Sequence, residues 1–229
     1  MTTTARPIPP PPPPADKALP FDTLDELIDA LGVPASRILL NPPIGTATEA
    51  DVVRLVDGEP KRLVELIDGT LVEKAMGNRE SELAAVLVVA IGSFVYPRKL
   101  GKVYGADLMA RMKGKNVRLP DVAFVAYADV PGGKLVHESI MSASMTLAVE
   151  ALSPGNTRKE MRQKREEYFA SGARRVWEFD MNTRTCAVYS TPEQARILRE
   201  GDTLDGEDVL PGFTVGLAEL FAQVDRQGP

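Results

Sequence analysis

The chain has 229 residues, 44% hydrophobic and 26% charged, which is typical of an ordinary globular protein. A formal net charge of −5 argues against a protein that coats polyanions, although an acidic total is compatible with a local basic groove for nucleic acid. The single cysteine, Cys186, excludes an intramolecular disulfide and a cysteine-based zinc site. The longest apolar run, residues 83–91, is too short to cross a bilayer, so we expect a soluble cytoplasmic protein without a membrane partner.

The first 47 residues divide into two parts. Residues 1–20 contain the tract RPIPPPPPPADK, whose prolines restrict it to polyproline II or disorder, and we expect a tail there. A proline-rich ligand for a partner domain is the alternative interpretation. Residues 21–47 are expected to be a short helical extension, with Asp22 or Thr23 as the N-cap and Gly32 as the stop.

The rest of the chain predicts one domain over residues 48–222 and a tail at 223–229. A short helix is expected at residues 48–57, and two short strands flank Asp68-Gly69, a strong hairpin signal. A helix follows at 79–96 and is expected to end at Pro97 and Gly101. The later elements are strands at 102–112, 121–127 and 145–152, a charged helix at 157–171, the hairpin of RRVWEFD and TCAVYS, and a strand and helical turn at 215–221. This order predicts a mixed central sheet flanked by helices, in the α/β or α+β class.

Three acidic residues occupy positions where burial alone would place apolar ones. Asp121 opens the run VAFV, which is apolar on both faces and therefore a central strand. Glu150 ends the apolar run of LAVEALSP, and Glu80 lies on the buried stripe of its helix, three residues before Leu83. Carboxylates gathered in a low-dielectric pocket repel one another unless a cation or protons neutralise them. Oxygen-only ligation predicts Mg²⁺ or Mn²⁺ rather than zinc.

A basic residue near such a site would help to hydrolyse a phosphodiester by orienting water or stabilising negative charge. Lys164 is the candidate, because it lies at the border of the packed face that Met161 and Tyr168 mark on the charged helix. Its stem could follow the sheet while its amine reaches the carboxylates. Periodicity alone leaves a solvated helix face as the commoner interpretation of such a residue.

Six segments together resemble the Uma-two family of restriction-endonuclease-like proteins, within the PD-(D/E)XK nuclease superfamily. They are VELIDGTLVE (64–73), GKVYGADLMAR (101–111), LPDVAFV (119–125), LAVEALSPGN (147–156), KREEYFASGARRVWEFD (164–180) and LPGFTVGLAELF (210–221). The resemblance implies a restriction-endonuclease-like fold, often dimeric, with Asp121 and Glu150 as metal ligands. Leu152 replaces the lysine of the superfamily signature, and Lys164 matches the lysine that substitutes for it in this family. Glu80 stands where many relatives have a histidine.

The leading hypothesis is therefore a Mg²⁺-dependent (or Mn²⁺-dependent) endonuclease that hydrolyses DNA, with RNA as another possible substrate, and that forms a homodimer. Asp121, Glu150 and Glu80 are the expected metal ligands, and Lys164 is expected near the attacking water. One rival is a catalytically inactive nuclease fold that binds nucleic acid or regulates, and another is a structural or protein-interaction module.

Several other polar residues have plainer interpretations. Glu65 and Glu73 alternate with apolar hairpin positions and are expected to face solvent, and Asp107 is expected at the surface. His137, the only histidine, lies in a polar loop where neither a catalytic triad nor a histidine-rich metal site is expected.

Overall fold

The protein, described here by a computed structural model of residues 21–226, is built around a mixed six-stranded sheet. Its strand order is β10 (Ala195–Arg199), β9 (Thr185–Tyr189), β8 (Arg175–Asp180), β7 (Leu147–Leu152), β6 (Val122–Ala126) and β3 (Gly101–Tyr104). Strands β7 and β8 run parallel, and every other neighbouring pair is antiparallel. The expected mixed central sheet is thereby confirmed.

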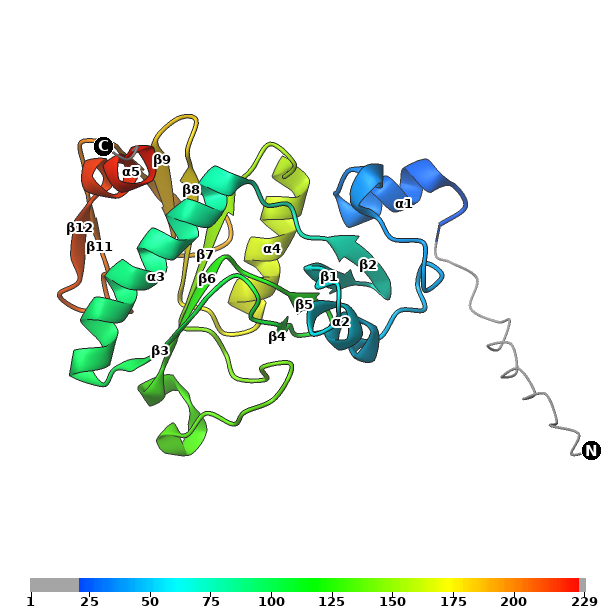
Figure 1. Ribbon diagram of the computed structural model, residues 1–229, viewed down its shortest axis with the longest axis horizontal. Helices are drawn as coiled ribbons and strands as arrows, with labels where there is room; N and C mark the ends of the chain where they lie inside the picture. The colour runs from blue at the N-terminus through cyan, green and yellow to red at the C-terminus, as the bar shows by residue number, and fades with distance from the viewer. Residues whose placement is uncertain (1–20, 227–229) are drawn as a thin grey trace, which may run out of the picture.

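A second, four-stranded sheet lies beside the first (Figure 1). Its order is β2 (Thr70–Glu73), β1 (Val64–Ile67), β5 (Val117–Arg118) and β4 (Ala110–Arg111). The β1–β2 hairpin turns at Asp68-Gly69, and both residues have positive φ, as the sequence signal predicts. Strands β11 (Thr203–Asp205) and β12 (Thr214–Gly216) form a separate pair.

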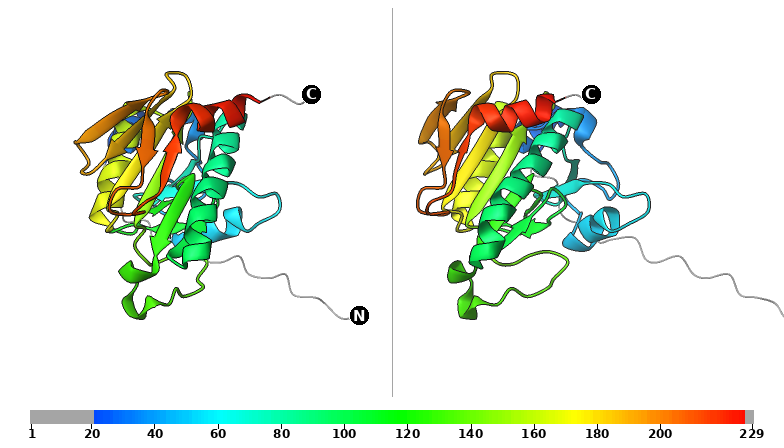
Figure 2. Two further views of the ribbon diagram at one scale, coloured as in Figure 1. Left: turned by 90° about the vertical axis from the view of Figure 1, so that its left-hand side faces the viewer. Right: turned by 60° about the vertical axis from the view of Figure 1, so that its left-hand side comes forward.

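Helices cover both faces of the six-stranded sheet (Figures 1 and 2). Helices α3 (Asn78–Arg98) and α5 (Leu217–Asp225) pack together on one face, and α4 (Arg158–Ala170) packs on the other. Helices α1 (Leu24–Leu31) and α2 (Glu49–Val56) accompany the four-stranded sheet, and three short 3₁₀ turns occupy Ala35–Arg37, Tyr127–Asp129 and Pro131–Gly133.

Strand alternation decides which side chains meet which helix. Successive residues of a strand point to opposite faces. Val122 and Phe124 of β6 belong to the core cluster under α3, whereas Ala123 and Val125 pack with Tyr168 of α4. By the same alternation, Asp121, two positions before Ala123, and Glu150, two positions after Ala148, point to the face of the sheet that α4 covers, here called the α4 face.

Several local signals act as the sequence predicts. The Thr23 side chain accepts a hydrogen bond from the Glu26 amide at the start of α1, and Gly32 ends that helix in the left-handed conformation. Thr157 and Glu160 form a capping box at the start of α4.

Three boundaries differ from expectation. The prediction of one continuous strand at 102–112 is wrong. The chain leaves the six-stranded sheet after Tyr104, turns at Gly105–Leu108, and joins the other sheet as β4. Pro97 does not stop α3, which continues to Arg98. Helix α5 extends to Asp225, so part of the expected tail at 223–229 is helical.

Helix α3 is a core element of this fold. Its length and composition alone would suffice to cross a membrane. However, Leu83, Leu87, Ile91 and Val95 form a fully buried stripe that packs on the sheet, which is how a core helix of this length behaves.

The N-terminal extension packs onto the domain. Leu27 and Leu31 of α1 and Ile38 after it share a hydrophobic cluster with Ile67 of β1 and Val72 of β2. Residues 21–47 are thus part of the folded unit, whereas the proline tract expected to form a tail lies outside the described residues.

Candidate active site

Asp121 and Glu150 lie next to each other across two central strands. In the antiparallel register of β6 and β7, Val122 pairs with Val149, so the next position along brings Asp121 opposite Glu150. The Asp121 amide donates to the Val149 carbonyl oxygen over 3.0 Å, which holds Asp121 against β7 just before the first residue of β6. Directly opposed residues on one face have Cβ atoms about 5 Å apart. The structure therefore brings the two expected ligands together on the α4 face.

The two oxygens of Asp121 have different surroundings. Oδ2 accepts a hydrogen bond of 2.7 Å from the Ala151 amide. Oδ1 accepts no hydrogen bond among the described residues, and it lies 2.7 Å from the ammonium nitrogen of Lys74. Only 2% of the Lys74 side chain is exposed, and its Nζ also donates to the Ala106 carbonyl oxygen at 3.2 Å. Asp121 is thus neutralised by an internal cation.

Sequence reasoning missed Lys74, although a signal was available. Val72 is fully buried in β2, and Lys74 is two residues farther along, where the Lys74 amide still pairs with the Leu63 carbonyl oxygen. Because side chains two residues apart share a face, Lys74 continues the buried side of the hairpin.

Glu150 is held by two residues of α4. The Lys164 ammonium lies 3.3 Å from each carboxylate oxygen of Glu150, and the Tyr168 hydroxyl donates to Oε1. Burial raises the pKa of Glu150 to about 7, with Lys164 opposing the rise and Asp121 adding to it. Burial opposes the charged form of Lys164, but Glu150 and Glu65 outweigh it and raise the lysine's pKa. The site therefore keeps Lys164 as an ammonium.

The expectation that Glu65 faces solvent is wrong. All four residues of β1 are buried, and Glu65 is completely so. Its carboxylate lies 3.0 Å from Lys164 Nζ and 3.0 Å from an Arg118 nitrogen, and it accepts a hydrogen bond from the Leu119 amide. Burial alone would raise the pKa of Glu65, but Lys164 and Arg118 outweigh it and lower it to about 2.

These groups belong to a larger set of ion pairs on α4. Arg118 also binds Glu167 at 2.6 Å, and Arg37 of the N-terminal extension forms a bidentate pair with Glu160. We use the name buried charge cluster for Arg37, Glu65, Lys74, Arg118, Asp121, Glu150, Glu160, Lys164 and Glu167. Four cations face five carboxylates in it, which agrees with the tendency of Glu150 to retain a proton.

A third carboxylate extends the row across the sheet. In the parallel register of β7 and β8, Glu150 pairs with Glu178. Glu178 is buried and binds Arg165 at 2.7 Å, and burial raises its pKa despite that partner. Sequence reasoning missed Glu178, which lies within the apolar run VWEF. Asp121, Glu150 and Glu178 each have a separate cation.

Glu80 makes its local contacts at the start of α3. It belongs to the first turn of α3, three residues after the N-cap Gly77, and its carboxylate folds back so closely that a Cβ on Gly77 would lie 2.2 Å from Glu80 Oε2. A negative charge there is favourable because it faces the positive end of the helix dipole. Within residues 21–226, no hydrogen bond or ion pair joins Glu80 to Asp121, Glu150 or Lys164.

Two cavities flank the end of β7. One, of about 360 Å³, is lined by Lys74, Gly77 and Ser153 among others, so it opens beside the cation of Asp121. The other, of about 480 Å³, is lined by Leu152, Arg158 and Glu178 among others. Ser153 and Pro154 line both cavities and separate them. Asp121 and Glu150 line neither of these two cavities, so a molecule bound at this edge of the sheet would meet Lys74 on one side and Glu178 on the other.

The residues present could hold a magnesium ion with two protein carboxylates as ligands. Within the described part of the chain, no three acidic, histidine or cysteine residues form a group that could hold a metal. Magnesium, however, needs only one or two carboxylates when waters and substrate phosphates complete its octahedron. Asp121 and Glu150 provide that pair, although Asp121 Oδ1 would have to exchange its 2.7 Å contact with the Lys74 ammonium for the metal.

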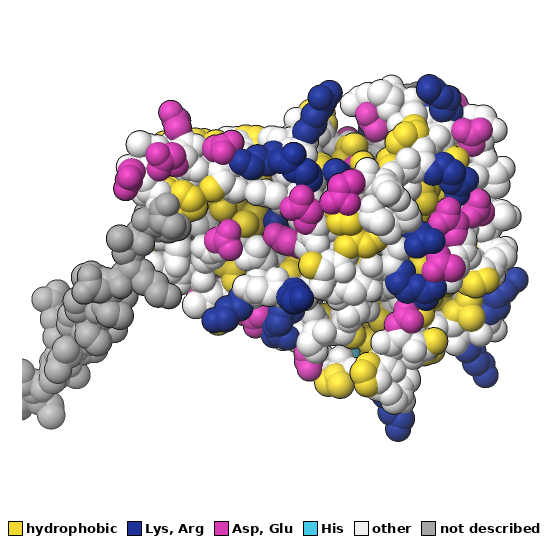
Figure 3. All heavy atoms as spheres, turned by 180° about the vertical axis from the view of Figure 1, so that it is seen from behind, with side chains coloured by type: hydrophobic (Ala, Val, Ile, Leu, Met, Phe, Trp, Pro, Cys, Tyr) yellow, Lys and Arg dark blue, Asp and Glu magenta, His cyan; other side chains and the backbone are white. Residues whose placement is uncertain are grey.

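The remaining side chains match their plainer interpretations. Asp107 is exposed and pairs with Lys61, and Cys186 and Trp177 are packed in the core. Tyr168 is also buried, but its hydroxyl contacts the site. On the face opposite α3, basic and acidic side chains are interspersed (Figure 3). That mixture agrees with the modest net charge.

Comparisons with known proteins support the same fold. The protein resembles a solved structure described as a "putative nuclease belonging to DUF820" from Anabaena variabilis ATCC 29413, with a TM-score of 0.63 and 18% sequence identity over 71% of this chain and 92% of that one. No curated protein matches the sequence. The sequence profile of the Uma2 family, described as "Putative restriction endonuclease", matches residues 50–219. Because this match covers most of the chain and includes Glu65, Lys74, Asp121, Glu150 and Lys164, the protein belongs to the Uma2 family.

Proposed function

We propose that this protein is a metal-dependent endonuclease that hydrolyses phosphodiester bonds of DNA. The observation that carries the proposal is the cross-strand pair of Asp121 and Glu150, buried on the α4 face with Lys164 3.3 Å from Glu150. Membership of the Uma2 family supports it. We also propose that the protein forms a homodimer and that it is located in the cytoplasm, as we expect from the sequence and from the family resemblance.

Asp121 and Glu150 would hold the metal, which is Mg²⁺ or Mn²⁺ in this proposal. Such an ion polarises the phosphodiester and lowers the pKa of a bound water. The strands β6 and β7 fix the two carboxylates rigidly, since both are central strands of the sheet. Glu80 is left outside the ligand set because its carboxylate covers the N-terminus of α3.

Lys164 would orient the attacking water and stabilise the negative charge of the pentavalent phosphorus. Its ammonium is held from two sides by Glu65 and Glu150, and it is anchored on α4, so it is positioned before substrate arrives. Preorganised charge in a site that excludes water contributes strongly to catalysis. Tyr168 fixes the Glu150 carboxylate through its hydroxyl.

Cleavage assays on supercoiled plasmid, single-stranded DNA and structured RNA, each with Mg²⁺, Mn²⁺ or EDTA, test the proposal. We expect cleavage of DNA that EDTA abolishes and that Asp121→Asn, Glu150→Gln and Lys164→Met each reduce by about 100-fold or more. Asp107→Asn is the matched control, because it removes an exposed aspartate charge from the same region. Cleavage that persists in Asp121→Asn, or no cleavage by the wild type, would refute it.

A second candidate function is nucleic-acid binding or regulation without turnover. The ion pair between Lys74 and Asp121 favours it, because the acidic site is already neutralised within the protein. This candidate predicts DNA binding in EDTA, measured by fluorescence anisotropy, that Asp121→Asn leaves unchanged and that no metal converts into cleavage.

A further inference from the structure

We infer that Lys74 is a built-in counter-ion that competes with the divalent metal for Asp121, so that the protein takes up metal only when the Lys74 ammonium moves away. This inference rests on the proposed function for the identity of the metal ligands. It concerns Lys74, to which the proposed nuclease function gives no role.

The competition follows from the surroundings of Asp121. Its Oδ2 is committed to the Ala151 amide, and its Oδ1 faces the Lys74 ammonium at 2.7 Å. Oδ1 is the Asp121 oxygen without a hydrogen bond, so we take it as the oxygen that a metal would approach. A divalent ion and an ammonium on one oxygen would repel each other strongly inside the protein, where charges are poorly screened.

The position of Lys74 is not that of an ordinary surface lysine. Its side chain is 2% exposed, its ammonium also bonds to the Ala106 carbonyl oxygen, and its charge counters the rise in the pKa of Glu150. It is thus the cation that neutralises Asp121, beside Glu150 with its own partner Lys164. An unneutralised carboxylate in that place would be costly.

The structure also offers a place for the displaced side chain. Lys74 lines the cavity of about 360 Å³ together with Ser36, Gly77 and Gly155, none of which carries a bulky side chain. A rotation of the flexible stem into this cavity would free Oδ1 while keeping the ammonium close to an incoming phosphate. Metal and DNA would then bind more strongly together than either alone, because the phosphate gives the displaced ammonium a new partner.

The test compares Mg²⁺ binding to the full chain by isothermal titration calorimetry in wild type, Lys74→Met and Lys61→Met. Lys61 is the matched control, because it also pairs with an aspartate, Asp107, but on the exposed surface. We expect Lys74→Met to bind Mg²⁺ about ten-fold more tightly than wild type or the control, since it removes a like charge from the ligand oxygen. The double variant Lys74→Met/Asp121→Asn should lose this gain.

Melting temperatures provide a second readout. In EDTA, Lys74→Met should melt below wild type because Asp121 lacks its cation, and Mg²⁺ should raise its melting temperature more than that of wild type. If Lys74→Met does not fold, Lys74→Gln removes the charge but keeps a donor for the Ala106 carbonyl oxygen. A folded neutral variant that binds Mg²⁺ no more tightly than wild type overturns the inference, whether or not wild-type binding is detectable.

The inference and the proposed function can fail separately. Tighter Mg²⁺ binding by the neutral variant, with no DNA cleavage by either protein, would uphold the role of Lys74 and refute the nuclease. Metal-dependent DNA cleavage, with equal Mg²⁺ affinity in wild type and the neutral variant, would uphold the nuclease and refute the role of Lys74.

Discussion

At the scale of single residues, the candidate site depends on pairs of opposite charge in a nearly dry environment. Glu65, Glu150 and Asp121 are each buried, and each lies within 3.3 Å of a lysine ammonium. A buried ion pair contributes little net stability, but removing one partner leaves an uncompensated charge. The cost of a substitution at these positions therefore depends on the partner that it leaves behind.

Glu65→Gln should be strongly destabilising at neutral pH, since it leaves Arg118 and Lys164 short of one negative charge. We expect a loss of about 3 kcal/mol in the free energy of unfolding, measured by urea denaturation at pH 7. The folded pKa of Glu65, about 2, lies below its ordinary value of 4.5, so the carboxylate contributes its stability above pH 4.5 and loses it as the pH falls toward 2. The difference between variant and wild type should narrow over that range.

Glu193→Gln is the control for this experiment, because Glu193 is exposed. Its effect should stay within about 0.5 kcal/mol at every pH. A difference between Glu65→Gln and wild type that is constant from pH 7 to pH 3 would contradict the assigned pKa.

Glu80→Gln should leave metal binding and cleavage within about three-fold of wild type, since the Glu80 carboxylate folds over the first turn of α3. Its measurable effect should be a loss of about 0.5 kcal/mol in the free energy of unfolding, from the lost charge at the helix N-terminus. A loss of Mg²⁺ affinity as large as that of Asp121→Asn would instead place Glu80 among the ligands.

At the scale of elements, α4 organises the site. Lys164, Glu167 and Tyr168 all project from it toward the sheets, and Lys159 and Glu160 of its first turn contact the N-terminal extension. Because α4 is the crossover that connects the parallel strands β7 and β8, it packs on one face of the sheet, near the end of β7. Its start at Thr157 determines where each of these side chains lies.

Thr157→Ala should destabilise the protein by about 1–2 kcal/mol, measured by urea denaturation. The Thr157 hydroxyl oxygen accepts a hydrogen bond of 3.0 Å from the Glu160 amide, and the hydroxyl also donates to the Gly32 carbonyl oxygen. Thr183→Ala is the control, because Thr183 is exposed and its hydroxyl contacts only the Thr185 side chain in the described structure, and we expect a loss of less than about 0.5 kcal/mol. Equal effects of the two substitutions would contradict a structural role for the cap.

The elements also show what could be predicted from the sequence. The hairpin at Asp68-Gly69 and the ends of α1 and α4 depend on local signals, and each lies where those signals predict. The division of residues 101–111 between two sheets has no local signal, because it depends on which strand each segment pairs with. Strands β10 and β11 were missed, as β10 is an exposed edge strand with little hydrophobic pattern.

At the scale of the whole molecule, the site is assembled from parts of the chain that are far apart in sequence. Asp121 and Glu150 could be predicted together, since each opens or ends an apolar strand. Their lysine partners were harder to predict. Periodicity placed Lys164 only at the border of the packed face, where the family resemblance supported it, and Lys74 is separated from Asp121 by the whole of α3. Periodicity reports which face a residue occupies, but not which distant residue it meets.

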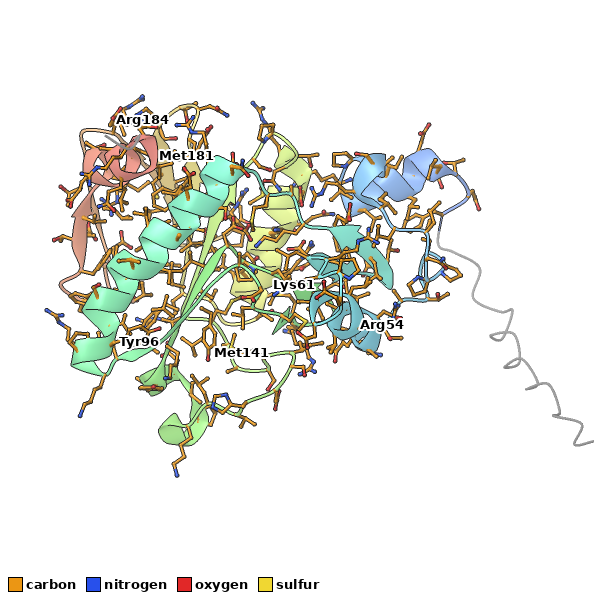
Figure 4. The ribbon with its side chains drawn as sticks, viewed as in Figure 1. Arg54, Lys61, Tyr96, Met141, Met181 and Arg184 are labelled. Carbon is orange, nitrogen blue, oxygen red and sulfur yellow. The ribbon has the colours of Figure 1, made fainter. Side chains whose placement is uncertain are left out.

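Arg37→Met should destabilise the whole protein by about 3 kcal/mol, because it leaves Glu160 buried on α4 without its partner. Arg37 also donates to the carbonyl oxygens of Glu73 and Gly155, so it joins the N-terminal extension to β2 and to the loop between β7 and α4. Arg54→Met is the control, since Arg54 lies on the exposed side of α2 (Figure 4) and, among residues 21–226, forms an ion pair only with Asp51. Thermal unfolding checks both variants, and an unchanged melting temperature for Arg37→Met would contradict this role.

The separation of the site residues along the chain has a consequence for the order of folding. During synthesis, Asp121 and Glu150 emerge before α4, so the carboxylates are made before Lys164 and Tyr168 can cover them. Strand β7 then acquires its parallel neighbour β8 only after the α4 crossover is complete. Contacts between such distant segments form late and slowly. The residues of the candidate site would therefore come together only after the domain has been synthesised through β8, and an unfinished chain would carry no assembled site.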